Sequence, residues 1–589
     1  MRVLIAFLFL CLLAPASHAT PEALKALFDE EWELRLARDP FLATMEGERR
    51  YNSEVPDVSP AAEARAVYED RALLARLDAI DPDDLNDEDR LDRDLLRFEI
   101  EARLRRAAFR PSRIPFLSDS GFHTLPVFVI EATPFDTPTD YEAYIARLRK
   151  LGGYIEDNIA NMQVGLAEGF TMPRAIMDGI LPGFAALAVN EVEKSPFWRP
   201  FETLPEGIES ETAARLRLDG RNALEEVVLP AYRRLHDFMA KTYLPRARET
   251  LGASDLPQGR AMYDMLIRHY TTLDLTADEV HAIGLEEVAR IRAEMTRVME
   301  KTGFEGDFAA FLAFLRSDPQ FYAKTPEELL MRAAFIAKRI DERLPAYFRT
   351  LPRMPYGVRA VPEDIAPNYT TGRYWPPIEG MRGGLYMVNT YALDKRPLYE
   401  LPALTLHEAV PGHHLQTALA SEAPERPRFR QRLYVNAFGE GWGLYAEKLG
   451  IEMGLYETPY EEFGRLSYEM WRAGRLVVDT GIHAMGWTRE QAIAFFLENS
   501  ALSEHNIETE VDRYISWPGQ ALAYKMGERA ILALRRKAET MLGEAFDIRD
   551  FHDAALLGGS LPLPILEERI DAWIADKRGY AINGTGTGQ

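Results

Sequence analysis

The sequence contains almost no cysteine. Its one cysteine, Cys11, lies in the apolar run of the first segment, "MRVLIAFLFLCLLAPASHAT". A single basic residue, that short run and the small-residue pattern Ser17-His18-Ala19 predict a signal peptide that is cleaved after Ala19. The mature chain then has no thiol, which excludes both disulfides and a cysteine nucleophile. Any bound metal ion must be held by histidine and carboxylate side chains.

Long apolar runs are also lacking. The run in the predicted signal peptide is too short for a comfortable membrane span, and no other segment is continuously apolar. Cys11 is not preceded by the small residues of a bacterial lipoprotein signal, so we expect plain secretion rather than a lipid anchor. The sequence therefore predicts an exported protein, periplasmic or extracellular, without stable membrane insertion.

Basic residues are in deficit. The chain has 69 Lys and Arg against 92 Asp and Glu, a net charge of −23. Nucleic acids and anionic membranes bind basic surfaces, so the charge disfavours both as partners. Linkers rich in glycine, serine or proline and internal repeats are missing too, which predicts a single domain over residues 20–589 after a signal peptide at 1–19. The sequence gives no indication of an oligomeric state.

Helical periodicity dominates the rest of the chain. In "LTADEVHAIGLEEVARIRAEMTRVMEK", apolar residues recur roughly at helical spacing, and Thr276 with Glu279 makes a capping box. Thr325, followed by a proline, and Thr488 begin similar helices. The predicted fold class is therefore mainly α.

One segment, residues 355–393, departs from this pattern. It carries frequent proline and glycine, many aromatic residues and no helical period, which predicts short strands and loops. Within it, "GGLYMVNT" alternates Leu385, Met387 and Asn389 with Tyr386, as a strand does. We expect a small β-sheet here, directly before a histidine-rich segment.

That segment, "LTLHEAVPGHHLQ", is close to the zinc-peptidase signature H-E-x-x-H, but Pro411 stands where the second histidine belongs. On a straight helix His407 and His413 would be about 9 Å apart along the axis, too far to share an ion. Pro411 and Gly412 distort a helix, and the chain between the histidines can loop out and return His413 to the face of His407. His414 then points elsewhere, although spacing alone leaves it as an alternative ligand.

A third ligand follows in "NAFGEGWGLYAEKLG". Glu440 lies 27 residues after His413, and two histidines with a glutamate are an ordinary zinc ligand set. Glu447, on nearly the same helical face, is either a partner that orients a ligand or a solvated helix residue. Incidental surface histidines are the alternative, but three of the 11 histidines fall within eight residues. We therefore predict a site for one zinc ion per chain at about residues 404–450.

Four segments together resemble a known family. They are "TLHEAVPGHHLQ", "FGEGWGLYAE", "WRAGRLVVDTGIHAMGW" and "RYISWPGQALAYKMG", and they are similar to the bacterial domain of unknown function family 885 over about residues 25–580. That family is grouped by resemblance with the gluzincin metallopeptidases, zinc enzymes with a first motif H-E-x-x-H and a glutamate ligand on a later helix. The resemblance implies a large two-lobed helical body with a central cleft and the small sheet beside the metal helix.

The resemblance also assigns roles at the predicted zinc site. His407 and His413 resemble the two histidine ligands, Glu440 resembles the glutamate ligand, and Glu408 resembles the general base. The insertion between the histidines departs from the family motif and leaves open whether His413 or His414 binds the metal.

Further candidates follow from the same segments. "RYIS" resembles the stretch of angiotensin-converting enzyme that carries its catalytic tyrosine, so Tyr514 is the first candidate for the hydrogen-bond donor to the oxyanion. Tyr524 is the second, with a core tyrosine as its alternative. Arg475, Asp479 and His483 recur every four residues along one helical stripe, which is either a buried ion-pair ladder or a wall that binds a substrate carboxylate.

The strand "GGLYMVNT" resembles the gluzincin edge strand along which a peptide lies, which would make Tyr386 and Asn389 substrate-binding; the alternative is a structural hairpin. The leading functional hypothesis is an exported zinc peptidase of short peptides with Glu408 as general base. A zinc hydrolase of a non-peptide amide or ester is the second. The third is a non-catalytic peptide-binding protein that kept the fold, against which the intact His407 and Glu440 argue.

Overall fold

The computed structural model describes residues 21–363, 365–378, 382–423 and 426–584. The predicted signal peptide, residues 1–19, lies outside these described residues. Of the helices that are described, none is long and apolar enough to cross a membrane. The chain is mainly helical with one small sheet, which confirms the predicted fold class at this coarse level.

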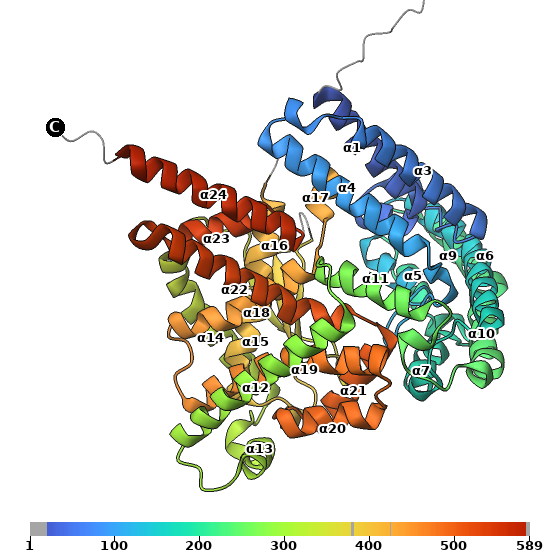
Figure 1. The fold of residues 1–589 in the computed structure, drawn as a ribbon. Coiled ribbons are helices and arrows are strands. Elements are labelled where there is room, and N and C mark those ends of the chain that lie inside the picture. The colour runs from blue at the N-terminus through green and yellow to red at the C-terminus, as the bar shows by residue number, and fades with distance from the viewer. Residues whose placement is uncertain (1–20, 364, 379–381, 424–425, 585–589) are drawn as a thin grey trace, which may run out of the picture.

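The first ten helices gather on one side of the molecule (Figure 1). Proline and a side-chain cap begin several of them; Thr137, for example, forms a capping box with Asp140 at the start of the longest. The helices are α1 (Pro21–Arg38), α2 (Pro40–Met45), α3 (Pro60–Asp78), α4 (Asp87–Ala107), α5 (Leu125–Phe128), α6 (Pro138–Glu168), α7 (Met177–Leu187), α8 (Arg199–Glu202), α9 (Ser210–Ala223) and α10 (Leu229–Phe238).

Most later helices occupy the other side, whereas α17 packs against α1 and α4 (Figure 1). Between the two groups, α11 (Gly259–Thr271) contacts both α4 and α18. The predicted helix starts at Thr276, Thr325 and Thr488 are confirmed, since each threonine side chain accepts the N–H three residues on. These helices are α12 (Ala277–Lys301), α13 (Phe308–Ser317), α14 (Pro326–Tyr347), α15 (Leu401–Glu408), α16 (His413–Ser421), α17 (Arg428–Arg432), α18 (Asn436–Glu452), α19 (Pro459–Met485), α20 (Arg489–Asn499), α21 (Glu504–Ser516), α22 (Ala523–Leu542), α23 (Ile548–Leu556) and α24 (Leu563–Gly584).

A three-stranded sheet lies within the segment predicted to form strands, which confirms that prediction. The order is β1-β3-β2, with β3 parallel to β1 and antiparallel to β2. The expectation that "GGLYMVNT" forms an edge strand is wrong, because β3 pairs on both sides and has no free edge for a peptide. The alternation in the sequence shows that the strand is buried but not which strands flank it. The strands are β1 (Tyr356–Ala360), β2 (Gly372–Trp375) and β3 (Gly384–Val388).

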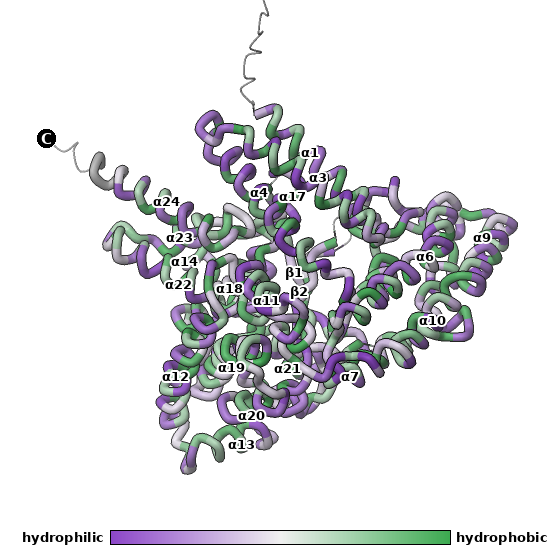
Figure 2. Tube along the Cα trace, turned by 45° about the vertical axis from the view of Figure 1, so that its right-hand side comes forward, coloured by the Kyte–Doolittle hydropathy of each residue, from purple (hydrophilic) through white to green (hydrophobic). Residues whose placement is uncertain are grey.

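The apolar cores draw on both groups of helices. One core includes Tyr141 and Tyr514, and a second includes Leu95 and Ile570. Along most helices hydrophobic and hydrophilic stretches alternate, as expected when one face of each helix is buried (Figure 2). The two helices that carry the histidine-rich segment, α15 and α16, pack within the later group, where each contacts α18 and one strand of the sheet.

Candidate metal centre

A break between two helices brings the histidines together. Helix α15 ends one residue after His407, and α16 begins at His413. A Cβ on Gly412 would lie 1.9 Å from the carbonyl oxygen of His407, so the turn admits only glycine there. The carbonyl of Pro411 accepts a hydrogen bond of 2.7 Å from the Trp442 indole. As a result, the rings of His407 and His413 have their centroids 4.7 Å apart.

Glu440, on α18, completes a three-residue cluster. Its Oε2 lies 3.6 Å from Nε2 of His407 and 3.5 Å from Nε2 of His413. Two ligands at about 2.0–2.1 Å from a tetrahedral zinc ion would be about 3.4 Å apart, so these separations fit zinc. Within the described part of the chain, this is the one group of three histidine or acidic side chains spaced to share an ion.

Glu447 contacts the His407 ring nitrogen that faces away from the cluster. Its Oε1 lies 2.8 Å from Nδ1 of His407 and 3.3 Å from the guanidinium of Arg472. A carboxylate on one imidazole nitrogen fixes the ring and leaves the other nitrogen for an ion, as is typical of histidine ligands. Gly443 makes room for this arrangement, since a Cβ there would lie 2.6 Å from the His407 ring. Glu447 is thus a buried partner of His407 and not a solvated residue.

The cluster is electrostatically suited to a cation. Burial alone would lower the pKa of His407, but hydrogen bonds to Glu440 and Glu447 raise it to about 10. Burial would raise the pKa of Glu440, but hydrogen bonds from both histidines hold it well below the usual range of a glutamate. Without an ion, the negative charges of Glu440 and Glu447 are balanced by a proton on His407. A divalent cation at the cluster would supply this positive charge instead.

His414 lies outside the cluster. Its Nε2 is 2.9 Å from the carbonyl oxygen of Met354, and its Nδ1 is 3.3 Å from the hydroxyl of Tyr374. The side chain is buried, and both ring nitrogens are engaged. The structure therefore places His413, rather than His414, beside the other two cluster residues.

Glu408 is held next to the cluster by the sheet. Its Oε2 accepts a 2.8 Å hydrogen bond from the backbone N–H of Tyr374, in strand β2. The carboxyl group is close enough to His407 and Tyr434 for its charge to raise the pKa of each. The outer edge of β2, and not β3, is thus the strand edge nearest the candidate base.

Tyr434, in the connection before α18, was not identified from the sequence. Its hydroxyl donates to Oε1 of Glu440 at 3.3 Å. The side chain is 51% exposed, but desolvation of the hydroxyl by its neighbours and the charge of Glu440 raise its pKa well above 10, so it remains a protonated donor at neutral pH. The residue lies outside any helical period. In the sequence, only its position six residues before Glu440 could have pointed to a role at the site.

The two predicted donor tyrosines surround Arg475. The Tyr514 oxygen accepts hydrogen bonds of 2.8 Å from the Trp471 indole and from Nε of Arg475. The Arg475 guanidinium lies 4.3 Å from the centroid of the Tyr524 ring. Tyr524 is near enough to Tyr434 to raise its pKa. Among the described residues, no hydrogen bond joins Tyr514 or Tyr524 to the three-residue cluster.

The predicted stripe of Arg475, Asp479 and His483 lies on α19, and its side chains hydrogen-bond to other elements. His483 accepts from the N–H of Ala253 at 3.0 Å and lies 2.9 Å from the carbonyl of Tyr514, so both ring nitrogens have backbone partners. Burial lowers its pKa to about 3. Burial raises the pKa of Asp479 to about 7, and its carboxyl accepts from the hydroxyl of Tyr263 at 2.5 Å. These contacts join His483 and Asp479 to residues of other elements and not to each other, so they form no ion-pair ladder along the helix.

The two candidates from the central strand are structural. The Asn389 amide donates to the carbonyls of Ala366 and Tyr369, both at 2.9 Å, and so holds the loop before β2. Tyr386 is fully buried, and its hydroxyl accepts from Thr405 at 3.4 Å. Neither side chain is exposed to a substrate in this arrangement.

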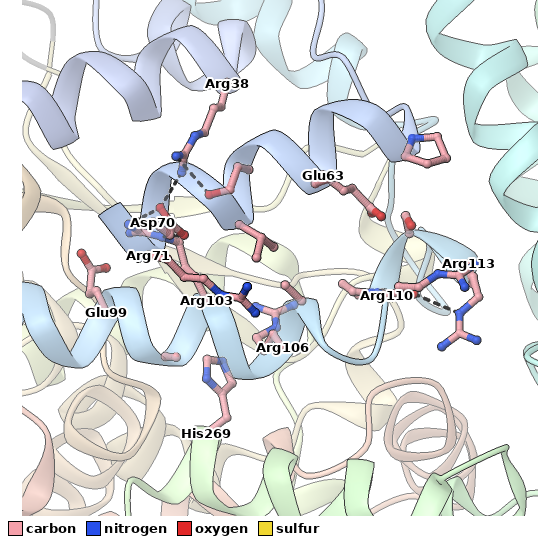
Figure 3. A pocket seen from close by; sticks show the side chains of 18 of the residues that line it. Arg38, Glu63, Asp70, Arg71, Glu99, Arg103, Arg106, Arg110, Arg113 and His269 are labelled. Atoms are coloured by element: carbon pink, nitrogen blue, oxygen red, sulfur yellow. Dashed lines mark hydrogen bonds and ion pairs between the residues drawn. The ribbon is translucent and has the colours of Figure 1, made fainter. Parts of the chain in front are cut away.

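A cavity of about 1080 Å³ is lined by arginines of α3 and α4 and by His269 of α11 (Figure 3). Its walls come from α3, α4, α11 and the residues that lead into α18, so it lies between the two groups of helices. Tyr434 lines this cavity and also contacts Glu440, and it therefore connects the cavity to the cluster.

Residues 40–570 match the model of a family described as bacterial protein of unknown function (DUF885). Because the match covers most of the sequence, the chain belongs to this family. No curated protein matches the chain. The matched range includes the three cluster residues, and the description of the family gives no function.

Two solved structures are similar to this one. A candidate lipoprotein from Colwellia psychrerythraea shares 28% sequence identity over 94% of this chain and 99% of its own, with a TM-score of 0.88. A candidate lipoprotein of unknown function from Shewanella oneidensis shares 17% identity over 93% of this chain and 99% of its own, with a TM-score of 0.73. The second likeness shows a common fold only.

Proposed function

We propose that this protein is an exported zinc peptidase that hydrolyses short peptides. The observation that carries the proposal is the spacing of His407, His413 and Glu440, which matches the ligand separations of zinc, with Glu447 behind one histidine. A catalytic zinc site has three protein ligands and one open position, and this cluster offers three. The resemblance to gluzincins supports a peptide as substrate.

His407, His413 and Glu440 would hold the zinc ion, which would supply an activated water and a Lewis acid for a carbonyl group. Glu408, held by the N–H of Tyr374, accepts the proton of the water and passes it to the leaving amine. The single proton of the Tyr434 hydroxyl, donated to Glu440 here, would be donated instead to the substrate oxygen that gains negative charge. Glu447 keeps the His407 ring in the orientation that directs its other nitrogen at the ion.

The size and place of the cavity support short peptides. A volume of about 1080 Å³ is at the upper end of small-ligand pockets and too small for a folded protein. The walls belong to the two groups of helices, which supports a two-lobed, gluzincin-like body whose cleft admits an extended chain.

Export is part of the proposal. The first residues have the pattern of a signal peptide, and the two similar solved structures are described as candidate lipoproteins. Both observations support a location in the cell envelope or beyond it.

Peptide-library cleavage tests the proposal. The mature protein, loaded with zinc, and its Glu408→Gln variant are incubated with the library, and products are identified by mass spectrometry. We expect cleavage by the wild type and almost none by the variant. Hydrolysis of simple esters or amides without any peptide cleavage would favour a non-peptide hydrolase, and zinc binding without any hydrolysis would contradict an enzymatic role.

A further inference from the structure

The cavity beside the cluster is basic, although the protein as a whole is acidic. Six arginines line it against three acidic side chains, while the chain has a net charge of −23. A cavity with this local excess of positive charge attracts anions despite the charge of the rest of the surface. The arginines are Arg38, Arg71, Arg103, Arg106, Arg110 and Arg113.

Four of the six arginines are already paired. Arg38 and Arg103 bind Asp70 at 2.7 and 2.9 Å. The two in the turn after α4 bind Glu168, at 3.2 and 2.6 Å. These four therefore stabilise the packing of the cavity walls and have less positive charge to offer a ligand.

Arg71, on α3, and Arg106, on α4, are different. Across the described residues neither makes an ion pair or a side-chain hydrogen bond, and both are exposed where they line the cavity. His269 extends from α11 toward the helix that carries Arg106 (Figure 3), and its Nδ1 is buried without a hydrogen-bond partner. Glu63 also lines the cavity, in the part of α3 nearer Arg110 (Figure 3). Two unpaired guanidinium groups thus face one space, and the wall of that space includes an imidazole whose buried Nδ1 has no hydrogen-bond partner.

We infer that this cavity binds the C-terminal carboxylate of a peptide, with Arg106 and Arg71 as its cationic partners. The inference rests on the proposed function for the position of the scissile bond. Tyr434 lines the cavity and contacts Glu440, so a peptide held at the cluster extends into the basic space. Guanidinium groups bind carboxylates through paired hydrogen bonds, whereas the cationic amino end of a peptide would be repelled.

This assignment makes the enzyme one that acts near the carboxyl end of its substrates. An aspartate or glutamate side chain in the substrate presents the same carboxylate chemistry. The experiment therefore compares three versions of one short peptide with otherwise neutral side chains: the free acid, the C-terminal amide, and the amide with one glutamate added.

Isothermal titration calorimetry of the zinc-loaded Glu408→Gln protein measures the three affinities. We expect the free acid to bind about 10- to 100-fold more tightly than the amide, the range for a charged hydrogen bond. Arg106→Ala combined with Arg71→Ala should abolish this difference. The single variant Arg106→Ala, which should reduce this difference, has a matched control in Arg97→Ala, also on α4. Each removes one positive charge, but the Arg97 side chain pairs with Asp78 at 2.9 Å outside the cavity.

Equal affinity for acid and amide, no binding of any peptide, or an equal loss in the Arg97→Ala control would overturn the inference. Tight binding of the glutamate-containing amide would overturn the C-terminal assignment in favour of side-chain recognition. The two proposals fail separately. Cleavage of amides with the same KM as acids would contradict the carboxylate site but not the peptidase activity. Acid binding that depends on Arg106, without any cleavage, would contradict the peptidase activity but not the carboxylate site.

Discussion

Replacing His413 or His414 by alanine should have opposite effects on zinc binding and on stability. The cluster offers three candidate ligand atoms, and His413 contributes one of them, its Nε2, which lies 3.5 Å from Glu440. Zinc bound by four ligands contributes about 10–16 kcal/mol, so an equal share is about 2.5–4 kcal/mol per ligand. The His413→Ala variant should therefore bind zinc about 10²- to 10³-fold more weakly. Its metal-free stability should change less than that of His414→Ala, because the polar partner of His413, Glu440, keeps its contact with His407.

His414→Ala should leave zinc affinity within about 10-fold of the wild type, because the ring contacts no member of the cluster. The substitution removes the partner of the Met354 carbonyl and of the Tyr374 hydroxyl. Each buried polar group left unsatisfied costs about 1–3 kcal/mol, so the loss of both contacts should lower the free energy of unfolding by about 2–6 kcal/mol.

Two measurements on each variant check this prediction. Competition with a chromogenic chelator gives the zinc affinity, and urea denaturation of the metal-free protein gives the free energy of unfolding. If His414→Ala abolished zinc binding while His413→Ala retained it, the ligand assignment would be refuted, although a metal centre with the other histidine would remain.

Four further predictions concern single side chains. Glu408→Gln should keep zinc and lose nearly all peptide turnover, as measured by zinc content and kcat; turnover within a few-fold of wild type would remove its role as base. Glu447→Gln should weaken zinc binding about 10- to 100-fold in the chelator assay, and an unchanged affinity would contradict its role behind the histidine ligand. Tyr434→Phe should lower kcat about 10- to 10³-fold with zinc retained, and an unchanged kcat would assign the oxyanion donor elsewhere. His483 has a pKa of about 3 when folded against about 6.5 unfolded, so the unfolded chain binds its proton between these values and stability is lost as pH falls from 6.5 toward 3. The difference in unfolding free energy between wild type and His483→Asn should therefore shrink with acidification, by up to about 1.4 kcal/mol per pH unit, and a constant difference would contradict the buried neutral imidazole.

Local patterns in the sequence predicted much of the fold and part of the site. Capping residues such as Thr276 marked helix starts because a cap depends on only four neighbouring residues. Pro411 and Gly412 predicted the helix break, since proline removes a backbone donor and glycine allows close approach of another chain segment. The structure brings together the three side chains that the sequence singled out as ligands, His407, His413 and Glu440.

Features that depend on distant parts of the chain could not be predicted in this way. The alternation around Tyr386 showed a buried strand, but the central position of β3 depends on pairing with two separate strands. Tyr434 lies in an irregular connection, and its relation to Glu440 follows from the folded path of the chain. The basic cavity combines residues as far apart as Arg38 and Asn436, which no local motif links.

The zinc content of the purified mature protein tests the central claim most directly. After removal of metal with a chelator, incubation with zinc and gel filtration, elemental analysis should find one zinc ion per chain. The same treatment of a variant that lacks both His407 and His413 should give none. A wild-type chain that retains no zinc after this loading would contradict the metal centre and, with it, the proposed peptidase.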